Sequence, residues 1–163
     1  MSEESPQVPV ENTDVIEAPA EPAEQVSEPA SESAPISSFP LTADIVSSGI
    51  SLLARTGNGL SFAYTRLDAH SKGITDLDIL ESFPNLRYLD VSENSLTNID
   101  GLAHLEYILS LDVHANNLTS VPAVIDKRKY LQQANFSKNR ISSWNVTRWP
   151  MLTWLNLNGI TCN

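Results

Sequence analysis

The sequence predicts an α/β fold in which short parallel strands stack into a solenoid, and two observations predict it. Three consecutive stretches repeat one spacing of apolar residues and end on an asparagine, at Asn94, Asn116 and Asn139. The steps between these asparagines are 22 and 23 residues, a regular period typical of stacked structural units. A unit of that length cannot bury its apolar face alone, so neighbouring units must stack to form one core.

The repeated unit is a leucine-rich repeat. Its three clearest copies read LRYLDVSENSL, ILSLDVHANNL and LQQANFSKNRI, and they begin at Leu86, Ile108 and Leu131. A degenerate copy precedes them, with Lys72 in the place of the asparagine, and a fifth copy begins at Leu152 without finishing. Residues 61–163 are therefore expected to form four repeats and an incomplete fifth.

Each copy predicts one short strand with its leucines pointing inward and the residues between them pointing outward. The three asparagines, here called the ladder asparagines, lie where the chain leaves the strand. Their side-chain amides are expected to bond backbone groups that would otherwise stay unpaired. The return segments are short enough for a 3₁₀ or one-turn helix, and Trp144 and Trp149 fall at their inward positions, which predicts two core tryptophans.

Residues 41–60 are expected to form a helix that caps the first repeat. Thr42 is a plausible N-cap, and Asp44 suits a first helical turn. One helical face would carry Val46, Ile50 and Leu53. The segment Gly57-Asn58-Gly59 is expected to end this helix.

Residues 1–40 have a different composition, with nine acidic residues, seven prolines and no lysine or arginine. Such a segment buries too little apolar area to offset its ordering entropy, so it is expected to be disordered. It carries nearly all of the formal charge of −10, and residues 41–163 are almost neutral. No basic patch occurs, which argues against a nucleic-acid partner.

Other function classes are disfavoured by what the sequence lacks. It shows no signal peptide and no stretch of membrane-spanning length, and Cys162 is its only cysteine, so we expect a reducing, cytoplasmic location. His70 and His114 would lie two strands apart, about 10 Å, which is too far for one metal ion. We find no catalytic constellation, no cofactor site and no metal site.

The outward strand positions form the candidate protein-binding surface, here called the concave face. Two interpretations of its three aspartates stay open. They are a solvated acidic stripe partly balanced by Arg66 and Arg87, or a docking strip for a basic partner segment, with Tyr88 and Trp154 as anchors. The candidate residues are Arg66, Asp68, Tyr88, Asp90, Ser110, Asp112, Gln133, Asn135, Trp154 and Asn156.

Several segments are more specific than the generic repeat: LLARTGNGL at 52–60, AY at 63–64, and LRY, VSEN and LT within residues 86–97. Through them the chain resembles, across residues 41–159, a family of leucine-rich repeat proteins from the radial spokes of motile cilia. The resemblance implies a non-enzymatic protein of the axoneme that helps build or attach the head of the third radial spoke. Its partners would be radial spoke or axonemal proteins, without nucleic acid or membrane.

A second function class is a regulatory subunit that docks on an enzyme, as similar 22-residue repeat proteins dock on a protein phosphatase. The TGNGL segment favours the ciliary family. Two departures from that family stand out, because its members have more repeats and a C-terminal extension, and because Ile160 follows Gly159 where an asparagine is expected. They indicate a truncated gene model, a splice variant or a fragment, with an uncapped apolar end that is expected to self-associate.

Overall fold

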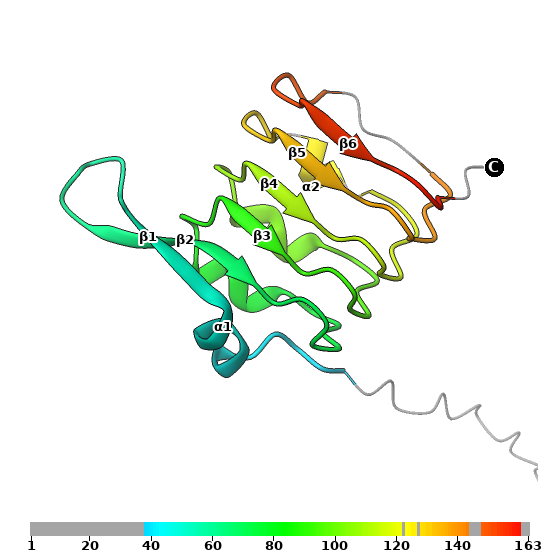
Figure 1. Cartoon of the computed structure of the whole chain (residues 1–163), viewed down its shortest axis with the longest axis horizontal. Helices are drawn as coiled ribbons and strands as arrows, with labels where there is room; N and C mark the ends of the chain where they lie inside the picture. Colours follow the sequence, from blue (N-terminus) through cyan, green and yellow to red (C-terminus); the bar gives the residue numbers. More distant parts are fainter. Residues whose placement is uncertain (1–37, 122, 127, 144–147, 161–163) are drawn as a thin grey trace, which may run out of the picture. The chain divides into compact units, whose positions relative to one another are not determined.

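The structure is a computed structural model that describes residues 38–121, 123–126, 128–143 and 148–160. The expected disordered tail therefore lies almost wholly outside the described residues. The described chain forms one six-stranded sheet in the order β1-β2-β3-β4-β5-β6 (Figure 1). The strands are β1 (Ile50–Arg55), β2 (Phe62–Asp68), β3 (Tyr88–Asp90), β4 (Ser110–Asp112), β5 (Gln133–Asn135) and β6 (Trp154–Asn156).

Strands β2 to β6 are parallel and pair one repeat with the next, which confirms the predicted solenoid. In each strand, the central residue of the three that pair with the neighbouring repeat points inward. These central residues are Leu67, Leu89, Leu111, Ala134 and Leu155. The first four are buried, whereas the side chain of Leu155 in the last strand is 37% exposed. The core therefore runs along the stack and opens at the β6 end.

The ladder asparagines behave as predicted. Asn116 is 5% exposed, and its Oδ1 accepts a hydrogen bond from the N–H of Leu96 at 3.0 Å. Its Nδ2 donates to the carbonyls of Val91, Val113 and His114 at 3.0 to 3.2 Å. One side chain therefore joins backbone groups of consecutive repeats where the strands end, as buried polar groups require.

The return segments contain short helices, in agreement with the prediction of 3₁₀ or one-turn helices. They are η1 (Asp78–Ser82), η2 (Asp100–His104) and the one-turn α2 (Ala123–Asp126). Trp149 is half-buried, stacks on Phe136 with ring centroids 6.1 Å apart, and donates its Nε1–H to the carbonyl of Ile125 at 2.8 Å. Trp144 lies outside the described residues.

Every repeat turns through a left-handed backbone residue just before its ladder position. Ser71, Glu93, Ala115 and Lys138 have φ between 52° and 54°, and Gly159 has φ 77°. Because Gly159 occupies the same place in the fifth copy, that copy keeps the register of the stack.

The prediction of a capping helix over residues 41–60 is wrong beyond residue 49. The helix α1 is Ala43–Gly49, with Thr42 as its N-cap, and Val46 is its buried residue. Ile50–Arg55 forms β1 instead, which pairs antiparallel with β2 and so covers the outer edge of the parallel sheet. A Cβ at Gly49 would lie 1.8 Å from the carbonyl oxygen of Asp68, so the end of α1 approaches β2 too closely for a side chain.

Residues Gly57-Asn58-Gly59 end no helix; they belong to the turn between β1 and β2. The N–H of Thr56 donates to the carbonyl of Ser61 at 2.8 Å, and Gly59 has φ 69°. The side chain of Asn58 accepts from the N–H of Leu60 at 3.1 Å. An Asn-Gly pair between two runs of alternating residues is a strong hairpin signal, and here it outweighs a helix-like spacing.

Candidate protein-binding face

The pairing register brings the predicted concave-face residues into two columns that run across the sheet. One column is Arg66, Tyr88, Ser110, Gln133 and Trp154, and the other is Asp68, Asp90, Asp112, Asn135 and Asn156. None of these residues is buried, because they alternate with the inward leucines. Just after the strand ends, Ser92 and Ser137 are buried.

The aspartate column has a structural role that the sequence interpretation missed. In each repeat, the Oδ1 of this residue accepts a hydrogen bond from the backbone N–H two residues later. The distances are 3.3 Å for Asp68 to His70, 3.0 Å for Asp90 to Ser92 and 3.0 Å for Asp112 to His114. Asn135 and Asn156 make the same contact at 3.3 and 3.1 Å. This side-chain turn ends the strand, and Asp and Asn serve it equally well.

Since an asparagine would suffice for the turn, the turn does not explain why three of the five positions carry a charge. In the described part of the chain, no ion pair joins Asp68, Asp90 or Asp112 to Arg66 or Arg87 within 4.0 Å. The contact of Asp112 with Nδ1 of His114 at 2.8 Å is an ion pair only when the imidazole is protonated. The expected balancing by the two arginines is therefore not seen.

Glu93 adds a further negative charge at the edge of the aspartate column. Its carboxylate oxygens lie 4.0 Å from Nε2 of His70 and 3.8 Å from Nε2 of His114. The hydroxyl of Ser71 donates to it at 2.8 Å, and this bond is the main reason that the pKa of Glu93 is lowered below 4.5; His70, His114 and Lys138 lower it further and desolvation opposes them. The described residues contain no group of three or more His, Cys, Asp or Glu side chains that could hold a metal ion.

The two expected aromatic anchors lie apart. Tyr88 is 39% exposed on β3 and Trp154 is 49% exposed on β6. Three strand spacings separate them, about 14 Å at the usual distance between strands. They are two separate contact points at different positions along the sheet.

A larger apolar patch lies on the β1–β2 hairpin, and the sequence interpretation did not include it. Tyr64 and Phe62 continue the outward side of β2 beyond Arg66, and Leu53 is paired opposite Tyr64. These three side chains are 49%, 60% and 60% exposed, and Arg55 lies 5.5 Å from the ring centroid of Phe62. The period-2 alternation of residues 62–68 could have predicted this outward patch. The sequence interpretation assigned the preceding residues 41–60 to a helix and therefore did not extend the face to the hairpin. The concave face therefore has an acidic centre and an apolar end.

Comparisons with known proteins agree with this architecture. A model described as Leucine Rich repeats (2 copies) matches residues 64–104. Leucine-rich repeat-containing protein 23 from Homo sapiens is 42% identical over 120 residues, which is 74% of this chain and 34% of that protein. The Xenopus tropicalis protein of the same name is 44% identical over 55 residues, or 34% of this chain and 16% of that protein. Over the longer alignment, this chain spans about a third of the relative's length.

Solved structures show the same fold. The functional domain of InlJ from Listeria monocytogenes superposes with a TM-score of 0.55 and 28% identity, covering 59% of this chain and 21% of that one. The leucine-rich ectodomain of the receptor kinase SOBIR1 from Arabidopsis thaliana gives a TM-score of 0.50 at 15% identity, with 69% and 79% covered. No helix among the described residues is long and apolar enough to cross a membrane.

Proposed function

Since this chain belongs to the leucine-rich repeat proteins, as a relative of leucine-rich repeat-containing protein 23, we propose that it is a non-enzymatic scaffold that binds a protein partner. The binding surface in this proposal is the concave face. Solenoids commonly bind partners on this side, where successive strands offer one residue each to an extended surface.

One observation carries the proposal: Asp68, Asp90 and Asp112 stand in register on adjacent strands without an arginine or lysine partner among the described residues. Strands lie about 4.8 Å apart, so the three carboxylates form a ladder about 10 Å long. Like charges so close repel one another, and a basic segment along the ladder would relieve that repulsion.

The apolar hairpin end extends the same surface. Leu53, Phe62 and Tyr64 continue the face beyond Arg66 and are exposed to solvent. Apolar side chains of a partner would bury this patch, which supplies affinity that exposed charges alone do not. The partner segment in this proposal therefore has lysine or arginine residues beside apolar ones.

The cellular setting is a further proposal that rests on the family resemblance. We propose that the partner belongs to the radial spokes of a motile axoneme, because the LLARTGNGL segment at 52–60 carries the likeness to that family. In the structure, this segment spans part of β1 and the hairpin turn beside the apolar patch. A protein phosphatase catalytic subunit is the alternative partner.

An affinity pull-down with the 163-residue chain separates these two partners. Recovery of spoke and microtubule proteins would support the first, and recovery of a phosphatase catalytic subunit would support the second. Immunolocalisation gives an independent reading: signal along a motile axoneme is expected, whereas a diffuse cytosolic signal would contradict the ciliary role.

The docking surface itself is tested by changing Asp68, Asp90 and Asp112 together to asparagine. Asparagine keeps the Oδ1 acceptor of the strand-ending turn, so the fold should persist while the charge is removed. Binding to the recovered partner should weaken and lose much of its salt dependence. The matched control removes three exposed acids of the return segments with the triple variant Asp78→Asn, Glu81→Gln and Asp100→Asn. Equal affinity in the two triple variants would contradict the docking proposal, and the aspartate column would then have only its structural role of ending the strands.

A further inference from the structure

Arg128 occupies an apolar position of the repeat. It lies three residues before Leu131, the first residue of its copy. The copies that begin at Leu86, Ile108 and Leu152 carry Phe83, Leu105 and Trp149 at that position. These are buried or half-buried members of the core or pack against it. Only the copy that begins at Leu131 places a charged side chain there, and that side chain is 5% exposed.

The guanidinium of Arg128 is only partly satisfied. Its Nη2 donates to the carbonyls of Leu102 and Ala103 at 2.7 and 2.9 Å, at the end of η2. Its Nε–H is buried and has no hydrogen-bond partner among the described residues. Burial lowers the pKa of Arg128, and the charge of Glu106 partly opposes this. No carboxylate in the described part of the chain lies within 4.0 Å of it, so the buried positive charge has no direct ion-pair partner among the described residues.

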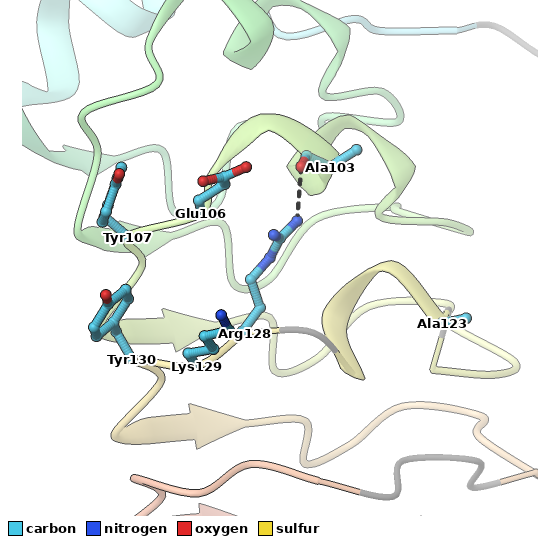
Figure 2. A pocket seen from close by; sticks show the side chains of 7 residues that line it. All are labelled: Ala103, Glu106, Tyr107, Ala123, Arg128, Lys129 and Tyr130. Carbon is cyan, nitrogen blue, oxygen red and sulfur yellow. Dashed lines mark hydrogen bonds between the residues drawn. The ribbon is translucent and has the colours of Figure 1, made fainter.

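A pocket of about 670 Å³ opens over this arginine (Figure 2). Besides Arg128, its wall includes Glu106, Lys129, Tyr107 and Tyr130. The two tyrosines hold equivalent positions in consecutive repeats and stack with centroids 5.8 Å apart and an interplanar angle of 24°. They are 52% and 42% exposed, so their rings form an accessible flat wall beside the charged floor.

We propose that this pocket binds a carboxylate side chain of an acidic peptide segment. Arg128 and Lys129 against Glu106 leave the lining with one net positive charge, which a single carboxylate balances and a dianionic phosphate exceeds. A planar guanidinium favours carboxylate partners, and a charge-assisted hydrogen bond is stronger than one between neutral groups. The tyrosine wall would pack against the peptide backbone or a neighbouring proline.

This site is separate from the concave face and has the opposite charge preference. Its residues come from η2, from the turn between η2 and β4, from the start of α2 and from the turn before β5, rather than from the outward strand positions. A partner could therefore occupy both sites at once, with basic residues on the aspartate column and an acidic residue in the pocket. The two proposals stand independently, because no residue belongs to both sites.

The test mixes the full 163-residue chain with the peptide acetyl-GPEQG-amide, which carries one carboxylate, and follows binding by ¹⁵N NMR. The Arg128 Nε–H gives its own resonance, and we expect it to shift saturably together with the backbone signals of Tyr107 and Tyr130. The uncharged acetyl-GPQQG-amide should leave these signals in place. Lys129→Gln should weaken binding about threefold and Glu106→Gln should strengthen it about threefold, as one charge at about 6 Å in a largely aqueous setting implies.

Arg140→Gln is the matched control, since it removes an exposed arginine outside the pocket and should leave the affinity unchanged. Both Lys129 and Glu106 are exposed, so their variants test the site even if replacement of the buried Arg128 prevents folding. Equal shifts with the glutamine peptide, or no shift at all, would overturn the proposal. If a phosphoserine peptide binds more tightly than the glutamate peptide, the carboxylate proposal is overturned and the ligand is a phosphate.

Discussion

Replacing Asn116 with alanine tests how the ladder asparagines stabilise the stack. The side chain makes four hydrogen bonds, one accepted from the N–H of Leu96 and three donated to backbone carbonyls. Counting each at the usual net value of about 1 kcal/mol would predict a loss of about 4 kcal/mol. That count ignores which backbone groups keep another partner after the change.

Each of the three carbonyls keeps another hydrogen-bond donor when Asn116 is replaced. The Val91 carbonyl also accepts from Asn94, and the Val113 carbonyl also accepts from Asn139. The third, of His114, also accepts from the N–H of Glu93. Among the described residues, only the buried N–H of Leu96 is left without a partner. One buried orphan donor costs about 1–3 kcal/mol, so we expect Asn116→Ala to lower the free energy of unfolding by about 2 kcal/mol.

The same reasoning predicts a larger loss of stability for a second ladder variant, Asn94→Ala, than for Asn116→Ala. Asn94→Ala would orphan two amide donors, the N–H groups of Lys72 and Ile74, and the carbonyl of Ala69, which has no other hydrogen bond in the described structure. We expect Asn94→Ala to cost more than Asn116→Ala by about 1–2 kcal/mol.

Urea unfolding followed by circular dichroism measures both variants, with Asn117→Ala as the control. Asn117 is half-buried, and no hydrogen bond of its side chain occurs among the described residues. The control should change the free energy of unfolding little. If Asn116→Ala and Asn117→Ala melt alike, or if Asn94→Ala is the milder ladder variant, the accounting of orphaned groups is wrong.

Three further predictions concern other parts of the chain. Gly49→Ala should destabilise the fold by about 1–3 kcal/mol, since the new Cβ would meet the Asp68 carbonyl, while Gly57→Ala, with nothing within 4 Å, should leave the melting temperature unchanged. Ser71→Ala should raise the pKa of Glu93 toward 4.5 in an NMR titration; because folding lowers this pKa, the carboxylate stabilises the fold above pH 4.5 and loses that effect as the pH falls through the folded value. Light scattering should show self-association of the 163-residue chain through the apolar β6 edge, and a clean monomer at tens of micromolar would refute this.

The parallel part of the sheet was predictable because its evidence is a period. The three clearest copies each place inward apolar residues and a ladder asparagine at fixed spacing, and a one-residue slip in any strand would turn its inward apolar side chains to solvent. The N-terminal segment has no repeat to support an interpretation. Val46, Ile50 and Leu53 fit a helical face, and the decisive fact, that the outer edge of β2 needs a pairing strand, belongs to the tertiary structure.

The candidate site was predictable in position and less so in role. Period-2 alternation places Asp68, Asp90 and Asp112 in one outward column, which the pairing register confirms. It does not reveal that each Oδ1 also ends its strand by accepting the N–H two residues later. The structure shows that the side chain has two separate properties. Its Oδ1 makes the turn, which asparagine would make equally well, and its charge is what an asparagine would remove.

Arg128 shows how a break in a repeat column can locate function. A stacked core gains stability when every copy places an apolar side chain at the same position, so a buried arginine there carries a desolvation cost that leucine would not. The two carbonyls at the end of η2 offset part of that cost, but they leave the Nε–H and the net charge uncompensated. If the role of Arg128 is only to hold η2, Arg128→Met should destabilise the fold, because it removes the two hydrogen bonds to the carbonyls at the end of η2, and acidic peptides should bind the folded variant as they bind the parent chain. If the arginine serves the pocket, the same variant should gain stability and lose the peptide, a pairing of opposite effects that a purely structural role does not produce.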